Sequence, residues 1–235
     1  MRKALIPFMV MAAIPGTGHA QVEQCVAPRI VPQVRAEGPT EREPRRVIPI
    51  GSYTLALSWS PEHCAGSTSA KDAFQCSGRG GQFGFVLHGL WPDGTGKTWP
   101  QYCRASGVLP PPVIRANLCV TPSAQLIQHE WAKHGTCMTT RPAAYFDRSR
   151  KMYGKLRFPD MAALARRDDL TAGDVADAMA AENADLRANM MRVTTTRDGW
   201  LDEIWMCLDK RLAAEPCKAG SGSVRPGAPI KIRMP

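Results

Sequence analysis

The chain has 235 residues, of which 44% are apolar, and a formal net charge of +9. This length and composition suit one domain with an ordinary buried core, and the sequence contains no internal repeat and no membrane-spanning run. The positive charge favours polyanionic partners such as nucleic acid or anionic lipid surfaces, although a basic surface that only aids solubility would carry the same charge.

Residues 1–20 have the layout of a secretory signal peptide. Arg2 and Lys3 precede an apolar run over residues 4–15, and small residues follow up to Ala20. The run is short for a membrane span and is interrupted by prolines. The sequence therefore predicts export, to the periplasm or outside the cell, with cleavage after Ala20 and no membrane attachment of the mature chain.

The cysteines fit an exported protein. All eight follow the predicted leader, and an even number in an exported chain predicts disulfide bonds. None of them forms a C-x-x-C pair, which disfavours a zinc ribbon or a thiol oxidoreductase. The spacing alone fixes none of the pairings.

The first half of the chain predicts a lead-in followed by two strands. Residues 21–50 are rich in proline and charge, which predicts a flexible lead-in. Residues 53–59 alternate apolar and polar side chains, as a half-buried strand does. Residues 83–91 form a second strand candidate, in which His88 projects from the face opposite the phenylalanines.

Three helices are predicted in the second half. Ser123 is a suitable N-cap for a helix that runs through Lys133 and ends at Gly135. Residues 142–153 and 171–187 also have helical patterns, the second with acidic residues in its first turns.

The remaining pattern predicts the fold class. Residues 202–208 are a run of strand length that suits a buried central strand, and residues 218–235 have the composition of a flexible tail. Strands and helices that alternate without a regular βαβ rhythm indicate an α+β domain, here over residues 51–217.

The segment HEWAKH, which begins at His129, concentrates chemically active side chains. In a regular α-helix its two histidines would lie roughly 140° apart, which disfavours one shared zinc ion. Glu130 would lie beside His134, and His129 beside Lys133, as i,i+4 neighbours. Trp131 would face away from these four residues, toward the core.

This set of side chains suits a phosphate. Lys133 and a protonated His129 would hold its oxygens, while Glu130 would orient the His134 imidazole. Cleavage of RNA through its own 2′-hydroxyl needs a base and an acid, which His134 and His88 could supply without a metal. The alternative is a polar, exposed helix with incidental histidines.

Two segments carry a resemblance to a known family. FVLHGLWPDG at residues 85–94 and HEWAKHGTC at residues 129–137 closely resemble the two active-site segments of the ribonuclease T2 family, which are acid endoribonucleases. Weaker likeness at residues 55–64 and 202–209 extends the resemblance over residues 52–217. The resemblance implies a single, disulfide-stapled α+β domain whose central antiparallel sheet is flanked by helices.

The resemblance also implies roles for the site residues. His88 would donate a proton to the leaving oxygen, and His134 would act as the base on the 2′-hydroxyl. Glu130 and Lys133 would stabilise the transition state, and His129 would bind the phosphate. The same roles with the two histidines exchanged remain open.

Base recognition is less clearly marked. Trp91 and Trp99 stand where the family stacks aromatic rings on a base, and Asp93 could accept a hydrogen bond from an exocyclic amino group. Packing in the core is the alternative for each tryptophan. Leu126 replaces an aromatic found in some members at a second base site, so the base preference stays open.

The resemblance implies one disulfide, between Cys103 and Cys137, which would tie the two histidine segments together. The polar loop after the first strand and the exit of the last strand each contain a pair that we expect to close. The expected bonds are therefore Cys103–Cys137, Cys64–Cys76, Cys207–Cys217 and, by elimination, Cys25–Cys119.

Three classes of function follow. The favoured hypothesis is an exported, monomeric endoribonuclease that cleaves RNA and not DNA, with no metal or other cofactor. The alternatives are a basic RNA-binding or signalling protein without catalysis, and a zinc hydrolase. A complete set of His88, Glu130, Lys133 and His134 favours the first, because a binding module needs no paired acid and base.

Overall fold

A four-stranded antiparallel sheet forms the centre of the molecule. The computed structural model describes residues 25–218 and 222–235. The strand order is β2-β1-β4-β3, and every neighbouring pair is antiparallel. The strands are β1 (Ser52–Trp59), β2 (Phe85–Asp93), β3 (Met191–Thr195) and β4 (Leu201–Leu208). The three predicted strand segments therefore belong to one sheet, with the segment 202–208 as an inner strand.

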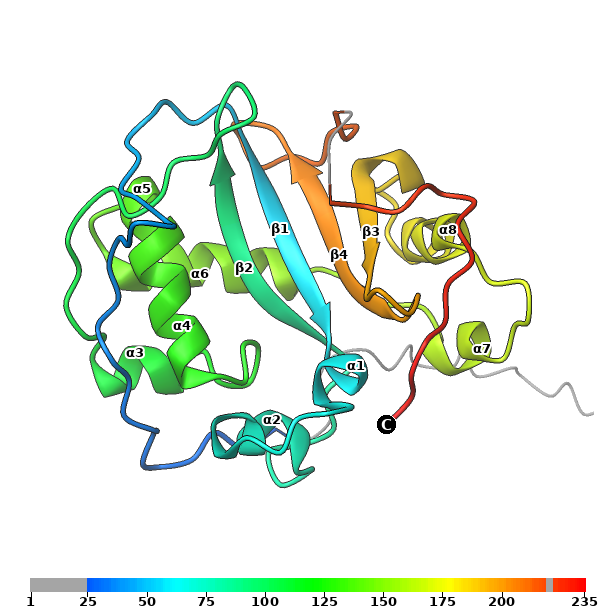
Figure 1. Ribbon diagram of the computed structural model, residues 1–235, viewed down its shortest axis with the longest axis horizontal. Helices are drawn as coiled ribbons and strands as arrows, with labels where there is room; N and C mark the ends of the chain where they lie inside the picture. The colour runs from blue at the N-terminus through cyan, green and yellow to red at the C-terminus, as the bar shows by residue number, and fades with distance from the viewer. Residues whose placement is uncertain (1–24, 219–221) are drawn as a thin grey trace, which may run out of the picture.

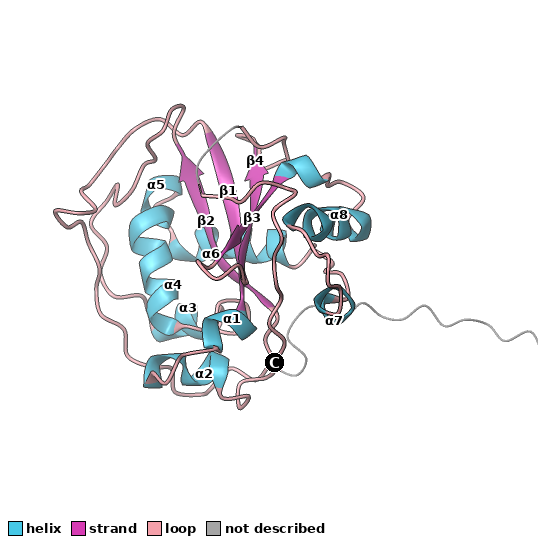
Figure 2. Ribbon diagram, turned by 45° about the vertical axis from the view of Figure 1, so that its right-hand side comes forward, coloured by secondary structure: helices cyan, strands magenta, loops and turns pink. Residues whose placement is uncertain are grey.

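Helices flank this sheet on its sides and on one face (Figure 1). The helix α6 lies behind the sheet, which the turned view also shows (Figure 2). The helices are α1 (Ser60–Cys64), α2 (Ala73–Cys76), α3 (Pro111–Arg115), α4 (Ala124–Glu130), α5 (Thr136–Met138), α6 (Pro142–Tyr153), α7 (Met161–Ala165) and α8 (Ala172–Glu182). This arrangement is the α+β architecture that the sequence predicted. No helix among the described residues is long and apolar enough to cross a bilayer.

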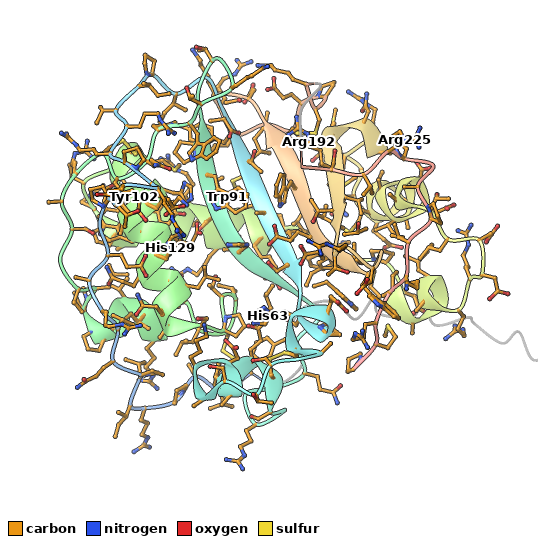
Figure 3. The ribbon with its side chains drawn as sticks, in the orientation of Figure 1. His63, Trp91, Tyr102, His129, Arg192 and Arg225 are labelled. Atoms are coloured by element: carbon orange, nitrogen blue, oxygen red, sulfur yellow. A yellow bond between two sulfur atoms is a disulfide. The ribbon has the colours of Figure 1, made fainter. Side chains whose placement is uncertain are left out.

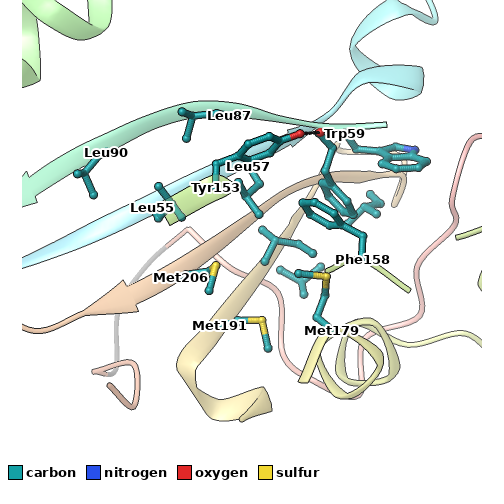
Figure 4. Close-up of a cluster of buried hydrophobic side chains, with 14 of the residues drawn as sticks. Leu55, Leu57, Trp59, Leu87, Leu90, Tyr153, Phe158, Met179, Met191 and Met206 are labelled. Carbon is teal, nitrogen blue, oxygen red and sulfur yellow. Dashed lines mark hydrogen bonds between the residues drawn. The ribbon is translucent and has the colours of Figure 1, made fainter. Parts of the chain in front are cut away.

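The main core lies between one face of the sheet and the helices behind it (Figure 4). Leu55, Leu57 and Trp59 alternate along β1 and are at most 4% exposed. Tyr153 of α6 lies against them, and its hydroxyl donates a hydrogen bond to the carbonyl of Phe85 at 2.7 Å. Full burial of one such large apolar side chain contributes about 1.5–3 kcal/mol to stability. The alternation leaves the intervening side chains of β1 on the other face, which carries the polar residues described below.

Four disulfides staple the domain, and they are the four expected pairs. The bonds are Cys25–Cys119, Cys64–Cys76, Cys103–Cys137 and Cys207–Cys217. The third bond joins the loop after β2 to the helical segment that carries His134.

The helix predicted from Ser123 to Gly135 continues further than expected. Ser123 caps it as predicted, because its hydroxyl accepts from the Leu126 amide at 3.3 Å. The chain does not leave the helix at Gly135 but passes through a π-helical turn, Trp131–Gly135, into α5. By contrast, α8 ends at Glu182, before the predicted end at residue 187, where Asn183 leaves the helical conformation.

The described parts of the two segments predicted to be flexible are packed against the domain. Residues 25–50 are held by a disulfide at Cys25 and by paired backbone hydrogen bonds between Arg46 and Gln101. In the tail, Ile230 and Ile232 are 6% and 7% exposed and belong to the core. Composition indicated linkers in both cases, but a few anchoring residues with distant partners were enough to hold each segment. The predicted signal peptide lies outside the described residues.

Candidate active site

A β-bulge places His88 at the site. Along the β1–β2 pair, Ala56 pairs with Gly89 and Leu57 pairs with Leu87, so His88 is the extra residue between them. A bulge re-aims the side chain that it contains. As a result, the side chain of His88 is 29% exposed while Leu87 remains in the core.

Gly89 is required by the packing at this bulge. A Cβ atom placed on Gly89 would overlap the carboxylate of Glu130 and would lie 2.8 Å from the indole nitrogen of Trp91. The absence of a side chain at this position therefore allows Glu130 to approach the backbone of β2. Gly89 was not singled out from the sequence, and its place between His88 and Trp91 in the motif was the available signal.

The π-helical turn changes the geometry expected for the second histidine segment. A π-helix brings residue i+5 close to residue i along its axis, which a regular α-helix does not. The imidazole centroids of His129 and His134 are accordingly 6.4 Å apart. The expectation that these rings point in widely different directions is wrong, because it assumed 3.6 residues per turn throughout. Trp131 is 6% exposed and packs on Tyr145, as predicted.

His88 is surrounded by acidic groups. Its Nδ1 lies 2.6 Å from Oε1 of Glu203 on β4, and its Nε2 lies 3.7 Å from Oε1 of Glu130. Ser58 donates a hydrogen bond to the same Glu203 oxygen at 2.5 Å, and Trp205 donates to Oε2 at 2.6 Å. Burial alone would lower the pKa of His88, but the hydrogen bond to Glu203 and the nearby negative charges outweigh it and raise that pKa.

Glu203 was not predicted from the sequence. It lies in β4 and is 9% exposed. Burial raises the pKa of Glu203, but the hydrogen bonds that it accepts and the charge of His88 lower this pKa by more. The signal was a glutamate in a run of strand length that was predicted to be buried, because a buried carboxylate needs a partner.

His134 has the opposite environment. The residue is 6% exposed, and its Nδ1 has no hydrogen-bond partner among the described residues. Burial and then the positive charges of Lys133, His129 and His88 hold the pKa of His134 well below its usual value. The lowered pKa favours the neutral imidazole, which can accept a proton.

Glu130 is directed toward β2. Its Oε2 accepts hydrogen bonds from the Trp91 indole at 3.0 Å and from the Tyr145 hydroxyl at 3.3 Å. The expected role of Glu130 in orienting His134 is not supported, because its carboxylate is hydrogen bonded to these two side chains and lies beside His88. Burial raises the pKa of Glu130, although His88 and the two hydrogen bonds oppose the shift.

The two predicted phosphate-binding side chains are paired with carboxylates from the N-terminal segment. Nζ of Lys133 lies 2.5 Å from Glu43, and Nδ1 of His129 lies 2.5 Å from Glu37. Figure 3 shows His129 to one side of Trp91, beside Tyr102. Neither glutamate was singled out from the sequence, because both lie in the segment predicted to be a flexible lead-in.

The three predicted base-binding residues differ in their position relative to the histidines. Trp91 lies between the two histidines, with ring centroids 5.0 Å from His88 and 5.7 Å from His134. Asp93 lies on the same strand and accepts from the Thr54 hydroxyl at 2.7 Å. Trp99 is 45% exposed on the loop that follows, so it does not pack in the core.

One group of side chains could in principle approach a cation. Ligand atoms of His129, Glu130 and His134 lie within 4.8 Å of one another. Donors bound to one zinc ion at about 2.0–2.1 Å are roughly 3.4 Å apart, so this group would have to contract to hold it. Since the π-helical turn brings His129 and His134 to one side, their spacing does not exclude a shared ion, and chelation is the direct test of a metal requirement.

The fold brings together two imidazoles, one with a raised pKa and one with a lowered pKa, beside a lysine. Such an arrangement suits acid–base chemistry at an anionic group. Residues 50–217 match the model of the ribonuclease T2 family. The chain belongs to this family.

Curated relatives are similar to parts of the chain. The "Probable ribonuclease" of Haemophilus influenzae is 28% identical over 183 residues, which are 73% of this chain and 62% of that protein. The "Ribonuclease" of Aeromonas hydrophila is 47% identical over 85 residues, which are 36% of each chain. The chain thus spans less than two thirds of the length of either relative.

Solved structures share the fold. The RNase-related protein from Calystegia sepium superposes with a TM-score of 0.60 at 22% identity, covering 75% of this chain and 95% of that one. Trichomaglin, described as an S-like ribonuclease, gives a TM-score of 0.58 at 19% identity, covering 75% and 96%. At these identities the likeness shows the fold alone.

Proposed function

We propose that the protein is an endoribonuclease that cleaves single-stranded RNA through its own 2′-hydroxyl and needs no metal. The observation that carries the proposal is the pair of imidazoles in contact with the ring of Trp91: the pKa of His88 is raised and that of His134 is lowered. An acid must start protonated and a base unprotonated, so the two environments support His88 as the acid and His134 as the base.

The proposed reaction transfers one proton at each end. His134 takes the proton of the 2′-hydroxyl, and the oxygen forms a bond to phosphorus. The bond from phosphorus to the 5′-oxygen breaks, and His88 gives its proton to that oxygen. The products are a 2′,3′-cyclic phosphate and a free 5′-hydroxyl, so atoms and charge balance.

The other predicted residues support this transfer. Lys133 supplies positive charge to the phosphorane, and His129 binds a phosphate oxygen. Glu130, whose Oε1 lies 3.7 Å from Nε2 of His88, stabilises the same transition state. Lys133 and His129 must first leave the carboxylates that now pair with them.

Base binding completes the proposal. Trp91 and Trp99 present rings on which bases stack, and Asp93 accepts from an exocyclic amino group. A relative in the same fold class, RNase NT, has been solved in complex with 5′-AMP, which supports a nucleotide as the ligand of such a site. DNA lacks the 2′-hydroxyl and is not a substrate.

We also propose that the protein acts as an exported monomer, in the periplasm or outside the cell. The leader pattern at residues 1–20 and four disulfides support export, since disulfides persist in oxidising compartments.

The test is incubation of the purified protein with an RNA and with DNA of the same sequence, both in EDTA. We expect the RNA to be cut, with early products that end in 2′,3′-cyclic phosphate, and the DNA to remain intact. RNA binding without cleavage would indicate the alternative binding protein. Loss of cleavage in EDTA that zinc restores would indicate the zinc hydrolase.

A further inference from the structure

Glu203 fixes which nitrogen of His88 faces the substrate. The carboxylate lies 2.6 Å from Nδ1, so Nδ1 carries a proton toward it, and Nε2 is the nitrogen that remains on the side of Glu130. Ser58 and Trp205 donate to the two oxygens of Glu203. Both oxygens of the carboxylate are thereby held, and the carboxylate cannot rotate away from His88 without loss of these hydrogen bonds.

We infer that Glu203 is a positioning residue for the reaction: it orients the His88 imidazole and stabilises its protonated form. The inference rests on the proposed role of His88 as the acid. Glu203 acts through His88 and does not itself contact the RNA in this scheme. Its distance of 115 positions from His88 in the chain means that only the packing of β4 beside β1 brings it there.

The charged groups that face His88 define the expected change. They are Glu203 and Asp202 on β4 and Glu130 on α4, and the titratable but neutral His134 lies nearby on the π-helical turn. Glu203→Gln removes one charge and keeps the side-chain size. Because this variant destabilises the imidazolium, the high-pH limb of kcat/KM moves to lower pH, by about one to three units for a charge so close.

The matched control is Asp202→Asn, the same charge change one residue earlier on β4 and without a hydrogen bond to His88. We expect Asp202→Asn to shift the limb less than Glu203→Gln does. Glu203→Asp keeps the charge, so its high-pH limb is expected to lie between those of Glu203→Gln and the wild type. Glu203→Ala also frees the ring and lowers kcat by about 10- to 100-fold, with KM less affected.

Folding of each variant is checked by thermal unfolding before kinetics. Folded Glu203→Gln with the same limb as wild type, or with the shift of Asp202→Asn, overturns the inference. The proposed function fails separately, if folded His88→Ala cleaves RNA at the wild-type rate.

A second, independent observation concerns residues 34–46, which we call the N-terminal strap. The strap runs beside α4 (Figure 1). Three residues of one helix face, Gln125, His129 and Lys133, bond to the strap in the order of the chain. Their partners are Arg35 and Glu37, then Glu37, then Glu43.

The chain is held on both sides of these contacts. Cys25, which precedes the strap, is bonded to Cys119, and Arg46 at the end of the strap forms paired backbone hydrogen bonds with Gln101 at 2.9 Å. Between them, the Tyr102 hydroxyl donates to Glu43 at 3.2 Å, while its amide donates to the Lys133 carbonyl at 2.8 Å. The guanidinium of Arg46 also lies 5.5 Å from the centroid of the Trp99 ring.

These contacts occupy the groups that the reaction requires. Glu37 and Glu43 place carboxylate oxygens on the two cationic side chains that would hold a phosphate, and the Arg46 guanidinium lies near the half-exposed ring of Trp99, which would stack a base. Lys133 holds the pKa of Glu43 below its usual value, so this carboxylate stays charged in mildly acidic solution.

We propose that the N-terminal strap is an intramolecular competitor of RNA, whose carboxylates stand in for phosphate oxygens until substrate displaces them. Removal of a competing carboxylate then strengthens binding of a nucleic acid. The probe is a 2′-deoxy oligonucleotide, which cannot be cleaved by the proposed route and therefore reports binding alone.

Glu43→Gln is compared with Glu41→Gln, which removes the same charge two residues away from an exposed side chain without a partner among the described residues. We expect Glu43→Gln to lower the Kd by about fivefold and Glu41→Gln by less than about twofold. In a Lys133→Gln background the effect of Glu43→Gln is expected to disappear, because the competing contact is already lost.

Three results would overturn the proposal that the strap competes with RNA. Equal effects of Glu43→Gln and Glu41→Gln would indicate general electrostatics. Weaker binding by Glu43→Gln would mean that the carboxylate positions Lys133 for the substrate. An effect that persists in the Lys133→Gln background would show that Glu43 acts elsewhere.

Discussion

His88 lies on a strand among carboxylates, whereas His134 lies on a π-helical turn among cations. Glu203 accepts from one imidazole, and Glu130 lies 3.7 Å from it. The other imidazole is buried beside Lys133 and has no hydrogen-bond partner for its Nδ1 among the described residues. The pKa of the imidazole is therefore raised at His88 and lowered at His134.

The difference between the two surroundings, and not the residue type, supports the proposed assignment of acid and base. The resemblance alone left the two histidine roles exchangeable. The surroundings of His88 on β2 stabilise a proton on its imidazole, and those of His134 on the π-helical turn destabilise one. Each histidine therefore starts in the state that its proposed role requires.

The largest effect is expected from loss of either imidazole. His88→Ala and His134→Ala each remove a proton-transfer partner and are expected to lower kcat by about 10²–10⁴-fold, with KM less affected. His63→Ala is the control, since His63 is 46% exposed and lies near Asp72, outside the site. Steady-state cleavage of a short RNA by folded variants measures the change. Near wild-type rates for either variant would remove that histidine from the mechanism.

The close approach of Glu130 to β2 is tested at Gly89. Gly89→Ala places a methyl group where the Glu130 carboxylate now lies, so Glu130 must leave its present position beside β2. A displacement of this size is expected to lower kcat/KM by about 10²-fold. Gly107→Ala is the matched control, because nothing lies within 4 Å of its added Cβ. Equal activity of the two variants would show that the close approach of Glu130 is not needed.

Local patterns predicted the elements that carry the site. The period of two in residues 53–59 matches β1, and Ser123 caps the helix that leads to His134. These features depend on neighbours within a few residues, so the sequence shows them directly. The two motif segments located His88 and the cluster around His134 for the same reason.

The sequence did not predict the features that depend on long-range packing. The bulge at His88 is a mismatch between two strands, and the π-helical turn inserts a residue into a helical pattern without breaking it. Glu203 is 115 positions from His88, and Glu37 is 92 positions from His129. Partners so distant are set by tertiary packing, which a pattern of local periodicity does not contain.

The pH dependence of the reaction sharpens the comparison. His134 must be neutral, so kcat/KM falls as pH drops through its lowered pKa. His88 must be protonated, so kcat/KM falls as pH rises through its raised pKa. We expect a broad plateau that includes the ordinary imidazole value of about 6.5, with limbs that belong to the coupled pair. A narrow peak would contradict the opposite shifts.

Lys133→Gln tests the low-pH limb of this profile, which His134 sets. Loss of its charge raises the pKa of His134, so the low-pH limb is expected to move to higher pH by about one unit, with the high-pH limb less changed. Lys71→Gln is the control for the net charge, because Lys71 is exposed near α2. A shift of the high-pH limb instead would show that Lys133 acts on the other imidazole.

The smallest effect is expected at Trp91, which contacts both imidazoles. Trp91→Phe keeps an aromatic ring between the histidines and removes the N–H that donates to Glu130. A hydrogen bond to a charged group contributes about 1.5–3 kcal/mol, but Tyr145 still donates to the same oxygen, so kcat is expected to fall only about 10-fold. KM for RNA is expected to change little, because a phenyl ring still stacks on a base. Trp91→Ala removes the ring as well and is expected to raise KM, since base stacking contributes about 1–3 kcal/mol. If Trp91→Phe and Trp91→Ala raise KM alike, the indole itself binds the base, and its contact with Glu130 is secondary.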